Sequence, residues 1–188
     1  MQKLGASQWP RDAEIVELFC GRGNGLHALE RLGFDHMEGM DLSRALLAEY
    51  HGPATTYLGD CRQLPFPERC KDVVIVQGGL HHLSTLPDDL DQVLMETHRV
   101  LRKNGRIVLV EPWLTPFLRM IHCIAAKQIA RHCSVKLDAL QTMIEHERRT
   151  YEQWLRAPRL ILTLVRARFF PIHESFAWGK WKFVGTPR

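Results

Sequence analysis

The segment EIVELFCGRGNGLHALERLG, residues 14–33, decides how this chain folds. It opens with a short apolar run over 14–20 that predicts a strand, and the run ends in a glycine-rich turn. Leucines then recur at helical spacing over 25–33, and Gly33 can cap the end of this helix. The order of strand, glycine turn and helix predicts one βα unit.

The same alternation continues as far as Pro112. Ser43 is a candidate N-cap for the second helix. Alternating strands and helices build parallel βαβ units with right-handed crossovers. The sequence therefore predicts a single α/β domain over 1–188, a Rossmann-like doubly wound fold with a mostly parallel, seven-stranded sheet. The remaining strands are predicted over 36–42, 54–60, 71–79 and 105–112, and the remaining helices over 43–52 and 88–105.

The pattern changes after Pro112. Residues 113–170 are rich in helix formers and apolar stripes, which predicts a helical insertion after the fifth strand. A crossover needs fewer residues than this, so we expect 113–157 to cover the carboxyl ends of the strands as a lid. If these stripes pair with a second copy instead, they form a homodimer interface. Residues 171–188 predict an antiparallel hairpin that turns near Gly179 and Lys180.

Composition narrows the class of protein. The chain has 188 residues, of which 45% are hydrophobic and 24% charged, as is typical of a globular domain. Its five cysteines are odd in number and show no CxxC spacing, which argues against a disulfide framework and indicates a reducing, cytoplasmic environment. We expect no signal peptide, no transmembrane helix and no metal site.

Charge is distributed unevenly along the chain. Residues 1–112 hold 12 Lys/Arg and 16 Asp/Glu, whereas residues 113–188 hold 13 Lys/Arg and five Asp/Glu. A solvated helical surface would account for the basic half. The alternative is a face that meets an anionic partner, such as an acidic substrate, a membrane surface or a nucleic acid.

Three successive strand ends carry candidate binding groups. The turn after the first strand contains Gly21 and Gly23, where backbone can approach a ligand closely. Asp41 ends the second strand and can accept both hydroxyls of a ribose, and Asp60 ends the third. Open α/β sheets bind ligands at this edge. Taken alone, Asp41 suits a nicotinamide cofactor and S-adenosylmethionine equally well.

The combination of motifs resembles one family. The runs ELFCGRGNG, GMDLS, GDCRQLPFPERCKDVVIVQGGLHHL and HRVLRKNGRIVLVEP occur in the order typical of class I S-adenosylmethionine-dependent methyltransferases, and most resemble the ubiquinone/menaquinone-biosynthesis branch. The resemblance covers about residues 14–112. It implies Glu17, Gly21 and Gly23 at the methionine end of S-adenosyl-L-methionine, Asp41 at the ribose, Asp60 and Cys61 at the adenine, and Gln77 after the fourth strand. Phe19 and Leu42 are also expected to bind the cofactor.

Two departures from the family pattern stand out. Phe19 occupies a position where the family usually has glycine, although its backbone carbonyl can still serve. Only 16 residues precede Glu17, where the family usually has helices that cover the site. Either the 113–170 segment supplies the cover, or a second chain does, or the chain is a shortened form.

Methyl transfer from a sulfonium is an in-line displacement that requires positioning, exclusion of water and, for some acceptors, a base. His81 and His82 are the candidate catalytic bases, with a structural role as the alternative. Glu111 is expected to be a structural or substrate-orienting acid.

Three other functions were weighed. A nucleic-acid methyltransferase is disfavoured because no cysteine adjoins a proline and Gln77-Gly78-Gly79-Leu80 replaces the Asn/Asp-Pro-Pro-aromatic tetrad. A nicotinamide-dependent oxidoreductase is disfavoured because no Tyr-x-x-x-Lys follows. A non-catalytic S-adenosylmethionine-binding protein remains an alternative. The favoured prediction is an enzyme that methylates a small-molecule or lipid-like acceptor, with peripheral membrane contact through the basic half.

Overall fold

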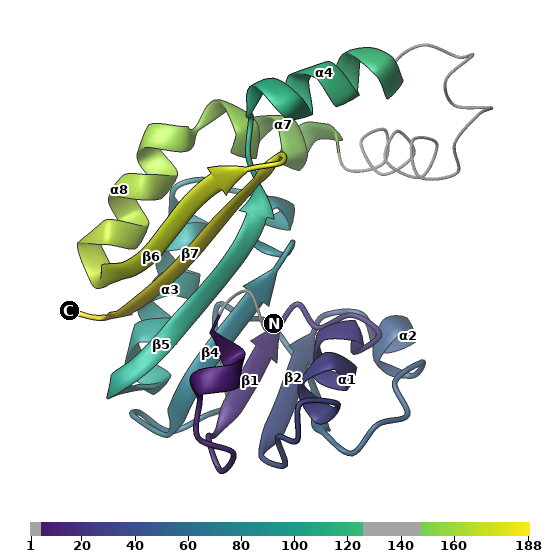
Figure 1. The fold of residues 1–188 in the computed structure, drawn as a ribbon, viewed down its shortest axis with the longest axis vertical. Coiled ribbons are helices and arrows are strands. Elements are labelled where there is room, and N and C mark those ends of the chain that lie inside the picture. The colour runs from purple at the N-terminus through teal and green to yellow at the C-terminus, as the bar shows by residue number, and fades with distance from the viewer. Residues whose placement is uncertain (1–4, 126–147) are drawn as a thin grey trace.

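The computed structural model describes residues 5–125 and 148–188, and it contains a twisted seven-stranded sheet in the order β3-β2-β1-β4-β5-β7-β6 (Figure 1). Neighbouring strands from β3 to β5 pair in parallel, whereas β7 runs antiparallel between β5 and β6. This arrangement confirms the predicted fold class, including the C-terminal hairpin. The strands are β1 (Ile15–Leu18), β2 (Met37–Asp41), β3 (Thr55–Leu58), β4 (Lys71–Gln77), β5 (Leu101–Pro112), β6 (Phe169–Ala177) and β7 (Lys180–Pro187).

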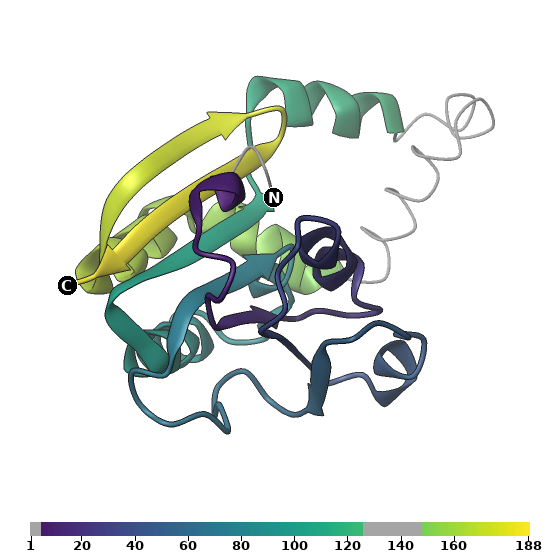
Figure 2. The ribbon, with the colours of Figure 1, turned by 60° about the horizontal axis from the view of Figure 1, so that its bottom comes forward.

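Helices cover both faces of the sheet (Figures 1 and 2). One apolar cluster joins the sheet to α3 and α8, and a second joins it to α1 and the N-terminal segment on the opposite face. The described helices are η2 (Ala6–Gln8), α1 (Asn24–Glu30), α2 (Arg44–Leu47), η3 (Leu80–His82), α3 (Asp88–Val100), α4 (Pro116–Ala125), α7 (Arg148–Arg156) and α8 (Pro158–Arg168).

Strand β4 shows why the central strands consist of continuous apolar runs. Val74 and Val76 belong to the cluster beneath α3, whereas Val73 and Ile75 belong to the cluster on the other face. Side chains alternate between the faces of a strand, so a strand covered on both sides needs apolar residues at every position.

Local capping agrees with the sequence at two helices. The Ser43 hydroxyl accepts a hydrogen bond from the backbone N–H of Leu46, which caps α2. Gly33 has a positive φ of 79°, and its N–H bonds to the carbonyl of Glu30 at the end of α1. Both helices are nevertheless shorter than their apolar periodicity suggests.

Predicted boundaries were wrong at the start of β6 and at the start of β5. Strand β6 begins at Phe169, inside the predicted 113–170 insertion. The helix expected over 88–105 ends at Val100, and β5 begins at Leu101. Leu101 is buried and pairs with Lys71 of β4 before a shift in register. The tertiary pairing with β4 therefore ends the helix although its charge pattern continues.

The segment after β5 divides into two parts. Helix α8 lies beside α3, and Arg168 at its end forms a bidentate ion pair with Asp91. Helices α4 and α7 lie beyond the carboxyl ends of β4 and β5 (Figure 1). The predicted insertion also includes residues 126–147, which lie outside the described residues. In the described ranges, no helix combines the length and apolar character needed to cross a bilayer.

Trp154 anchors α7 to the sheet, which allows a test of this packing. Its side chain is 1% exposed, and its Nε1–H donates to the carbonyl of Pro112 at 2.9 Å. We predict that Trp154→Ala lowers the free energy of unfolding by about 3–5 kcal/mol, because it leaves a large cavity. Urea denaturation followed by circular dichroism measures this change.

Trp178→Ala is the matched control, because Trp178 is 77% exposed. This variant should lose less than about 1 kcal/mol. Equal losses at both tryptophans would contradict the packing of α7 described above.

Candidate functional site

The turn after β1 adopts a backbone that favours glycine. Gly21 and Gly23 have φ values of 53° and 79°, and Phe19 has a φ of 56°. Such a left-handed conformation costs a non-glycine residue roughly 1–2 kcal/mol. The Phe19 ring packs directly on Gly79, where an added Cβ would lie 2.3 Å from the ring. Phe19 therefore adopts a backbone conformation that favours glycine, and its ring rests on the turn after β4.

Asp41 joins the turns that follow β1 and β2. Its carboxylate accepts the backbone N–H of Gly21 on one oxygen and that of Ser43 on the other, each at 2.8 Å. A carboxylate has about four acceptor positions, so both oxygens retain capacity for a ligand hydroxyl. Each carboxylate oxygen of Asp41 can therefore accept a further hydrogen bond beside the turn after β1.

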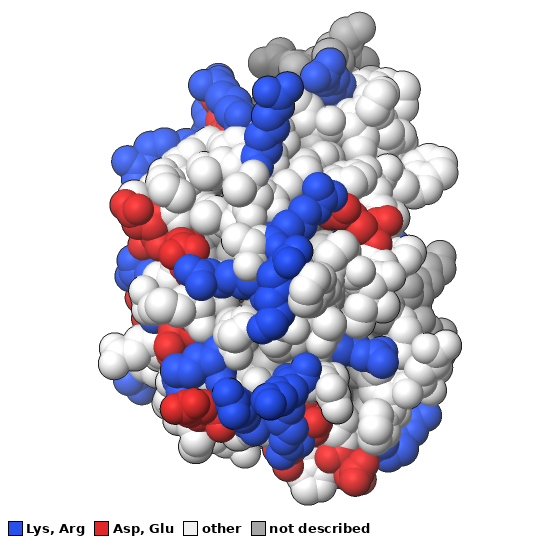
Figure 3. All heavy atoms as spheres, turned by 90° about the vertical axis from the view of Figure 1, so that its left-hand side faces the viewer, with Lys and Arg blue, Asp and Glu red and all other residues white. Residues whose placement is uncertain are grey.

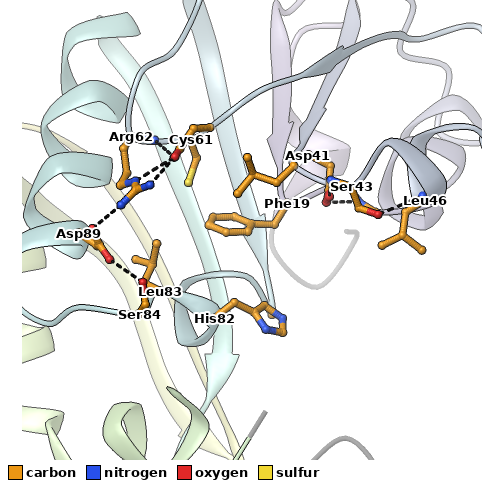
Figure 4. A pocket seen from close by; sticks show the side chains of 14 residues that line it. Phe19, Asp41, Ser43, Leu46, Cys61, Arg62, His82, Leu83, Ser84 and Asp89 are labelled. Carbon is orange, nitrogen blue, oxygen red and sulfur yellow. Dashed lines mark hydrogen bonds and ion pairs between the residues drawn. The ribbon is translucent and has the colours of Figure 1, made fainter. Parts of the chain in front are cut away.

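A cavity of about 480 Å³ opens where these strands end (Figure 4). Its lining includes residues from the ends of three successive strands, followed by the turn after β4. Six residues that the sequence singled out lie around it: Phe19, Gly21, Asp41, Leu42, Asp60 and Cys61. His82 lines it as well, and its ring lies at the side of the cavity opposite the Cys61 thiol (Figure 4).

Asp60 takes part in a network that the sequence did not reveal. Arg62 forms ion pairs with Asp60 at 2.6 Å and with Asp89 of α3 at 2.7 Å. The Arg62 guanidinium holds the pKa of Asp60 below its usual range. Asp89 also accepts from Ser84, so the network connects the end of β3, α3 and the loop between η3 and α3 (Figure 4). In the sequence, only Arg62, two residues after Asp60, indicated an ion pair at this position. Its other partner, Asp89, resembled an acid that stabilises the first turn of α3.

Cys61 lines this cavity, but its thiol is not a candidate nucleophile. Burial raises the pKa of its thiol to about 12, so the sulfur stays protonated near neutral pH. A thiolate nucleophile requires a lowered pKa, and Cys61 has the opposite environment.

Glu17 lies beneath the turn and is 3% exposed. Gln77 Nε2 donates to its Oε1 at 2.9 Å, and Oε2 has no hydrogen-bond partner. Burial raises the pKa of Glu17 to about 7, and the hydrogen bond from Gln77 opposes this shift. An added Cβ at Gly25 would lie 2.0 Å from Oε1, so only glycine leaves room for this carboxylate.

A second cavity of about 310 Å³ lies beyond the ends of β4 and β5. Gly78 lines both cavities, so they adjoin at the turn after β4. Segments from four parts of the chain line the second cavity. They are the turn after β4 with Gln77 and His81, the end of β5 with Glu111, the segment after β5 with Leu118 and Tyr151, and the hairpin with Trp178 and Lys180. No local sequence pattern marks Tyr151, because the His81 ring that it contacts is 70 residues away.

The two candidate bases face different cavities. His81 is buried and lines the second cavity, whereas His82 is exposed and lines the first. Nδ1 of His81 lies 2.9 Å from Oε2 of Glu111. An ionised carboxylate only accepts, so Nδ1 carries the proton and Nε2 is the basic nitrogen.

Glu111 organises the turn itself. Its other oxygen accepts the backbone N–H groups of Gly79 and Leu80, each at 2.9 Å. The carboxylate therefore fixes both the turn and the orientation of His81. Within residues 5–125 and 148–188, no three His, Cys, Asp or Glu side chains are grouped so as to hold a metal ion.

Comparison with known proteins gives this geometry a family. The family described as "Methyltransferase domain" matches residues 16–109, which is half of the chain. The chain belongs to this family. The match confirms the class expected from the motif series, and it spans the three strand ends that surround the first cavity.

Among curated relatives, this methyltransferase domain is 33% identical over 103 residues to demethylmenaquinone methyltransferase of Thermotoga maritima, covering 52% of the chain and 43% of that protein. It is 32% identical over 68 residues to the mitochondrial 2-methoxy-6-polyprenyl-1,4-benzoquinol methylase of Homo sapiens, covering 36% of the chain and 20% of that protein. The chain thus spans less than half the length of these relatives. The crystal structure of PH0226 from Pyrococcus horikoshii shares the fold, with a TM-score of 0.68 at 19% identity, over 94% of this chain and 82% of that one.

The pKa of Glu17 generates a test of the buried site. In the folded state Glu17 stays protonated up to about pH 7, whereas its ordinary value is 4.5. The buried, ionised carboxylate therefore lowers the free energy of unfolding more and more as the pH rises between these two values. Above the higher value the full loss is about 3 kcal/mol. We compare the free energy of unfolding of Glu17→Gln with that of the native chain. We predict that this difference shifts in favour of the variant by about 2–3 kcal/mol when the pH rises from about 5 to about 8.

Urea denaturation at the two pH values measures the gain. Exposed Glu49→Gln controls for the general effect of removing one carboxylate. A difference between Glu17→Gln and the native chain that does not change with pH would show that Glu17 does not titrate in this window.

Proposed function

We propose that this chain binds S-adenosylmethionine in the first cavity and transfers its methyl group to an apolar small molecule in the second. The observation that carries the proposal is the pair of adjoining cavities, which share Gly78 beside the Glu111-anchored turn. Two substrates must meet for a group transfer, and this arrangement brings two binding sites together at one point.

The residues around the first cavity fit the cofactor. Asp41 retains acceptor capacity for both ribose hydroxyls, and exposed Leu42 follows it as an apolar surface for the adenine. We assign Asp60 and the backbone of Cys61 to the adenine, and Phe19 and Gly21 to the methionine end. Glu17 and Gly23 are buried and are not among the residues that line this cavity. The volume of about 480 Å³ lies within the range of small-molecule sites.

S-adenosylmethionine supplies a methyl group already activated on a sulfonium. The chain must therefore position the acceptor, exclude water and receive a proton where the acceptor releases one. His81 suits the last role because its Nδ1 is held by Glu111, which leaves Nε2 basic. Gln77 lines the second cavity while it holds Glu17, and so connects the two halves of the site.

The second cavity suits a largely apolar acceptor. Leu118 of α4, Tyr151 of α7 and Trp178 of the hairpin supply apolar and aromatic walls, and Lys180 supplies one cation. Helices α4 and α7 thus act as the cover that selects the acceptor. The relatives are named for demethylmenaquinone and for a polyprenyl benzoquinol, and these compounds favour a hydroxylated ring with an isoprenoid tail as the acceptor.

One observation favours a second candidate, a domain that binds S-adenosylmethionine without turnover. The Phe19 ring extends into the first cavity from a position usually occupied by glycine (Figure 4). Arg62 also holds Asp60, the expected adenine partner. Tight binding of the cofactor without methylation of any quinol would distinguish this function.

The cofactor assignment predicts a selective affinity. Calorimetry should show that S-adenosylhomocysteine binds and that NAD does not. We predict that Asp41→Ala weakens S-adenosylhomocysteine binding by about 1.5–3 kcal/mol, because hydrogen bonds to a charged carboxylate are lost. This loss corresponds to roughly 10–150-fold in Kd.

Asp41 also holds the turn through Gly21, so a control must separate the two roles. Ser43→Ala removes the cap of α2 and keeps the carboxylate, and it should retain affinity within about threefold. NAD binding in place of S-adenosylhomocysteine would overturn the proposed function. Equal losses in the two variants would instead show that turn geometry, not a ribose contact, matters at Asp41.

The base assignment predicts a difference between neighbouring histidines. We predict that His81→Gln lowers kcat for a reduced demethylmenaquinone by about 100-fold or more, because general-base catalysis is lost. Its Kd for S-adenosylhomocysteine should not change. Transfer of labelled methyl groups, measured across pH, gives kcat and its dependence on the base.

His82→Gln is the matched control, since His82 lines the other cavity. It should affect cofactor affinity more than kcat. A pH profile of kcat that is identical in His81→Gln and the native chain would exclude His81 as the base.

A further inference from the structure

Apolar side chains lie at the start of α4 and at the tip of the β6–β7 hairpin, next to the second cavity. Leu114 precedes α4, half-buried Phe117 and exposed Met120 follow at three-residue spacing within it, and Trp178 lies at the tip of the hairpin. Trp178 is 77% exposed and Met120 is 50% exposed. We call these four residues the apolar rim. Exposed aromatic and aliphatic groups gathered in this way indicate an interaction surface.

The rim is a preformed unit and not a set of loose side chains. The Thr115 hydroxyl accepts the N–H groups of Gly179 and Leu118, and the N–H of Trp113 donates to the Gly179 carbonyl. The Phe117 and Trp178 rings also meet edge to face at 5.2 Å. The hairpin tip and the start of α4 are thus tied together, so the rim pays little ordering entropy when it docks.

Cations accompany the apolar groups. Arg119 and Lys180 are exposed beside the rim, and Lys182 is half-buried on β7. Residues 113–188 carry 13 Lys/Arg and five Asp/Glu. Figure 3 shows many Lys and Arg side chains over the side of the molecule formed by α8 and the β6–β7 hairpin, with uncharged surface and some Asp and Glu side chains between them.

We propose that the apolar rim docks on an anionic lipid membrane, so that the acceptor enters the second cavity from the bilayer. Trp178 belongs to the rim and also lines that cavity, together with Leu118 and Lys180 from the same two elements. Tryptophan prefers the membrane interface, and Lys and Arg are attracted to anionic headgroups. A surface that is both apolar and basic therefore matches a membrane better than it matches water or another basic copy of this chain.

The route for the acceptor rests on the proposed function, but docking itself does not. Vesicle binding needs neither cofactor nor methyl transfer, so it can fail while S-adenosylhomocysteine binding succeeds, and the reverse. The two hypotheses therefore stand on separate measurements.

Sedimentation with vesicles tests the docking. The full chain should bind vesicles of equal parts phosphatidylcholine and phosphatidylglycerol, and bind pure phosphatidylcholine far less. Met120→Glu places a negative charge in the rim and should weaken this binding about tenfold or more. Met95→Glu is the matched control, because Met95 is 42% exposed on α3 and lies outside the rim. It should bind as the native chain does.

Fluorescence quenching locates the contact. Of the five tryptophans, Trp9, Trp154 and Trp181 are buried and Trp113 is half-buried, so brominated lipids should quench mainly the exposed Trp178. Trp178→Phe should abolish most of the quenching while the chain still sediments with vesicles. The proposal is overturned by absence of binding to anionic vesicles, by equal binding of Met120→Glu and Met95→Glu, or by quenching that persists in Trp178→Phe. It is also overturned if light scattering shows a dimer that Met120→Glu dissociates and no vesicle binding, since the rim then meets a second copy.

Discussion

The carboxylate of Glu111, at the end of β5, accepts hydrogen bonds from the backbone of Gly79 and Leu80 and lies against Nδ1 of His81. Its side chain is fully buried, and a buried carboxylate is costly unless hydrogen bonds satisfy it. Because these three partners all belong to the turn after β4, the cost is offset only when that turn adopts this shape. The carboxylate therefore specifies the turn that lies between the two cavities.

Other features of the site depend on the same turn. Phe19 has a left-handed backbone, and its ring rests on Gly79. A residue in a strained conformation persists when the surrounding structure holds it there. Gly78 next to it lines both cavities, and the two histidines that follow divide between them. Movement of this turn would change both cavities, and with them the proposed cofactor and acceptor sites, together.

The C-terminal part of the chain lines the second cavity together with the parallel core. Strand β7 pairs antiparallel with β5 and brings Trp178 and Lys180 to the second cavity, while Trp154 fastens α7 to the end of β5. The same elements carry the apolar rim and the basic surface. Acceptor selection and membrane docking are thus proposed for one structural unit, built on a core that binds the cofactor.

Local pattern by itself determined the order of strands and helices, the parallel core, the hairpin and the glycine turn. These features follow from side-chain periodicity and turn chemistry within short segments, such as the leucines of α1 and the cap at Ser43. It also placed Asp41 and Asp60 at one edge, because parallel strands end on the same side of a sheet. Only the tertiary structure decided the end of α3, which pairing with β4 overrides at Leu101. It also decided which residues meet across long separations: Arg62 with Asp89, Tyr151 with His81, and Trp178 with Phe117. Those contacts depend on how elements pack, and packing is a property of the whole chain that no short segment contains.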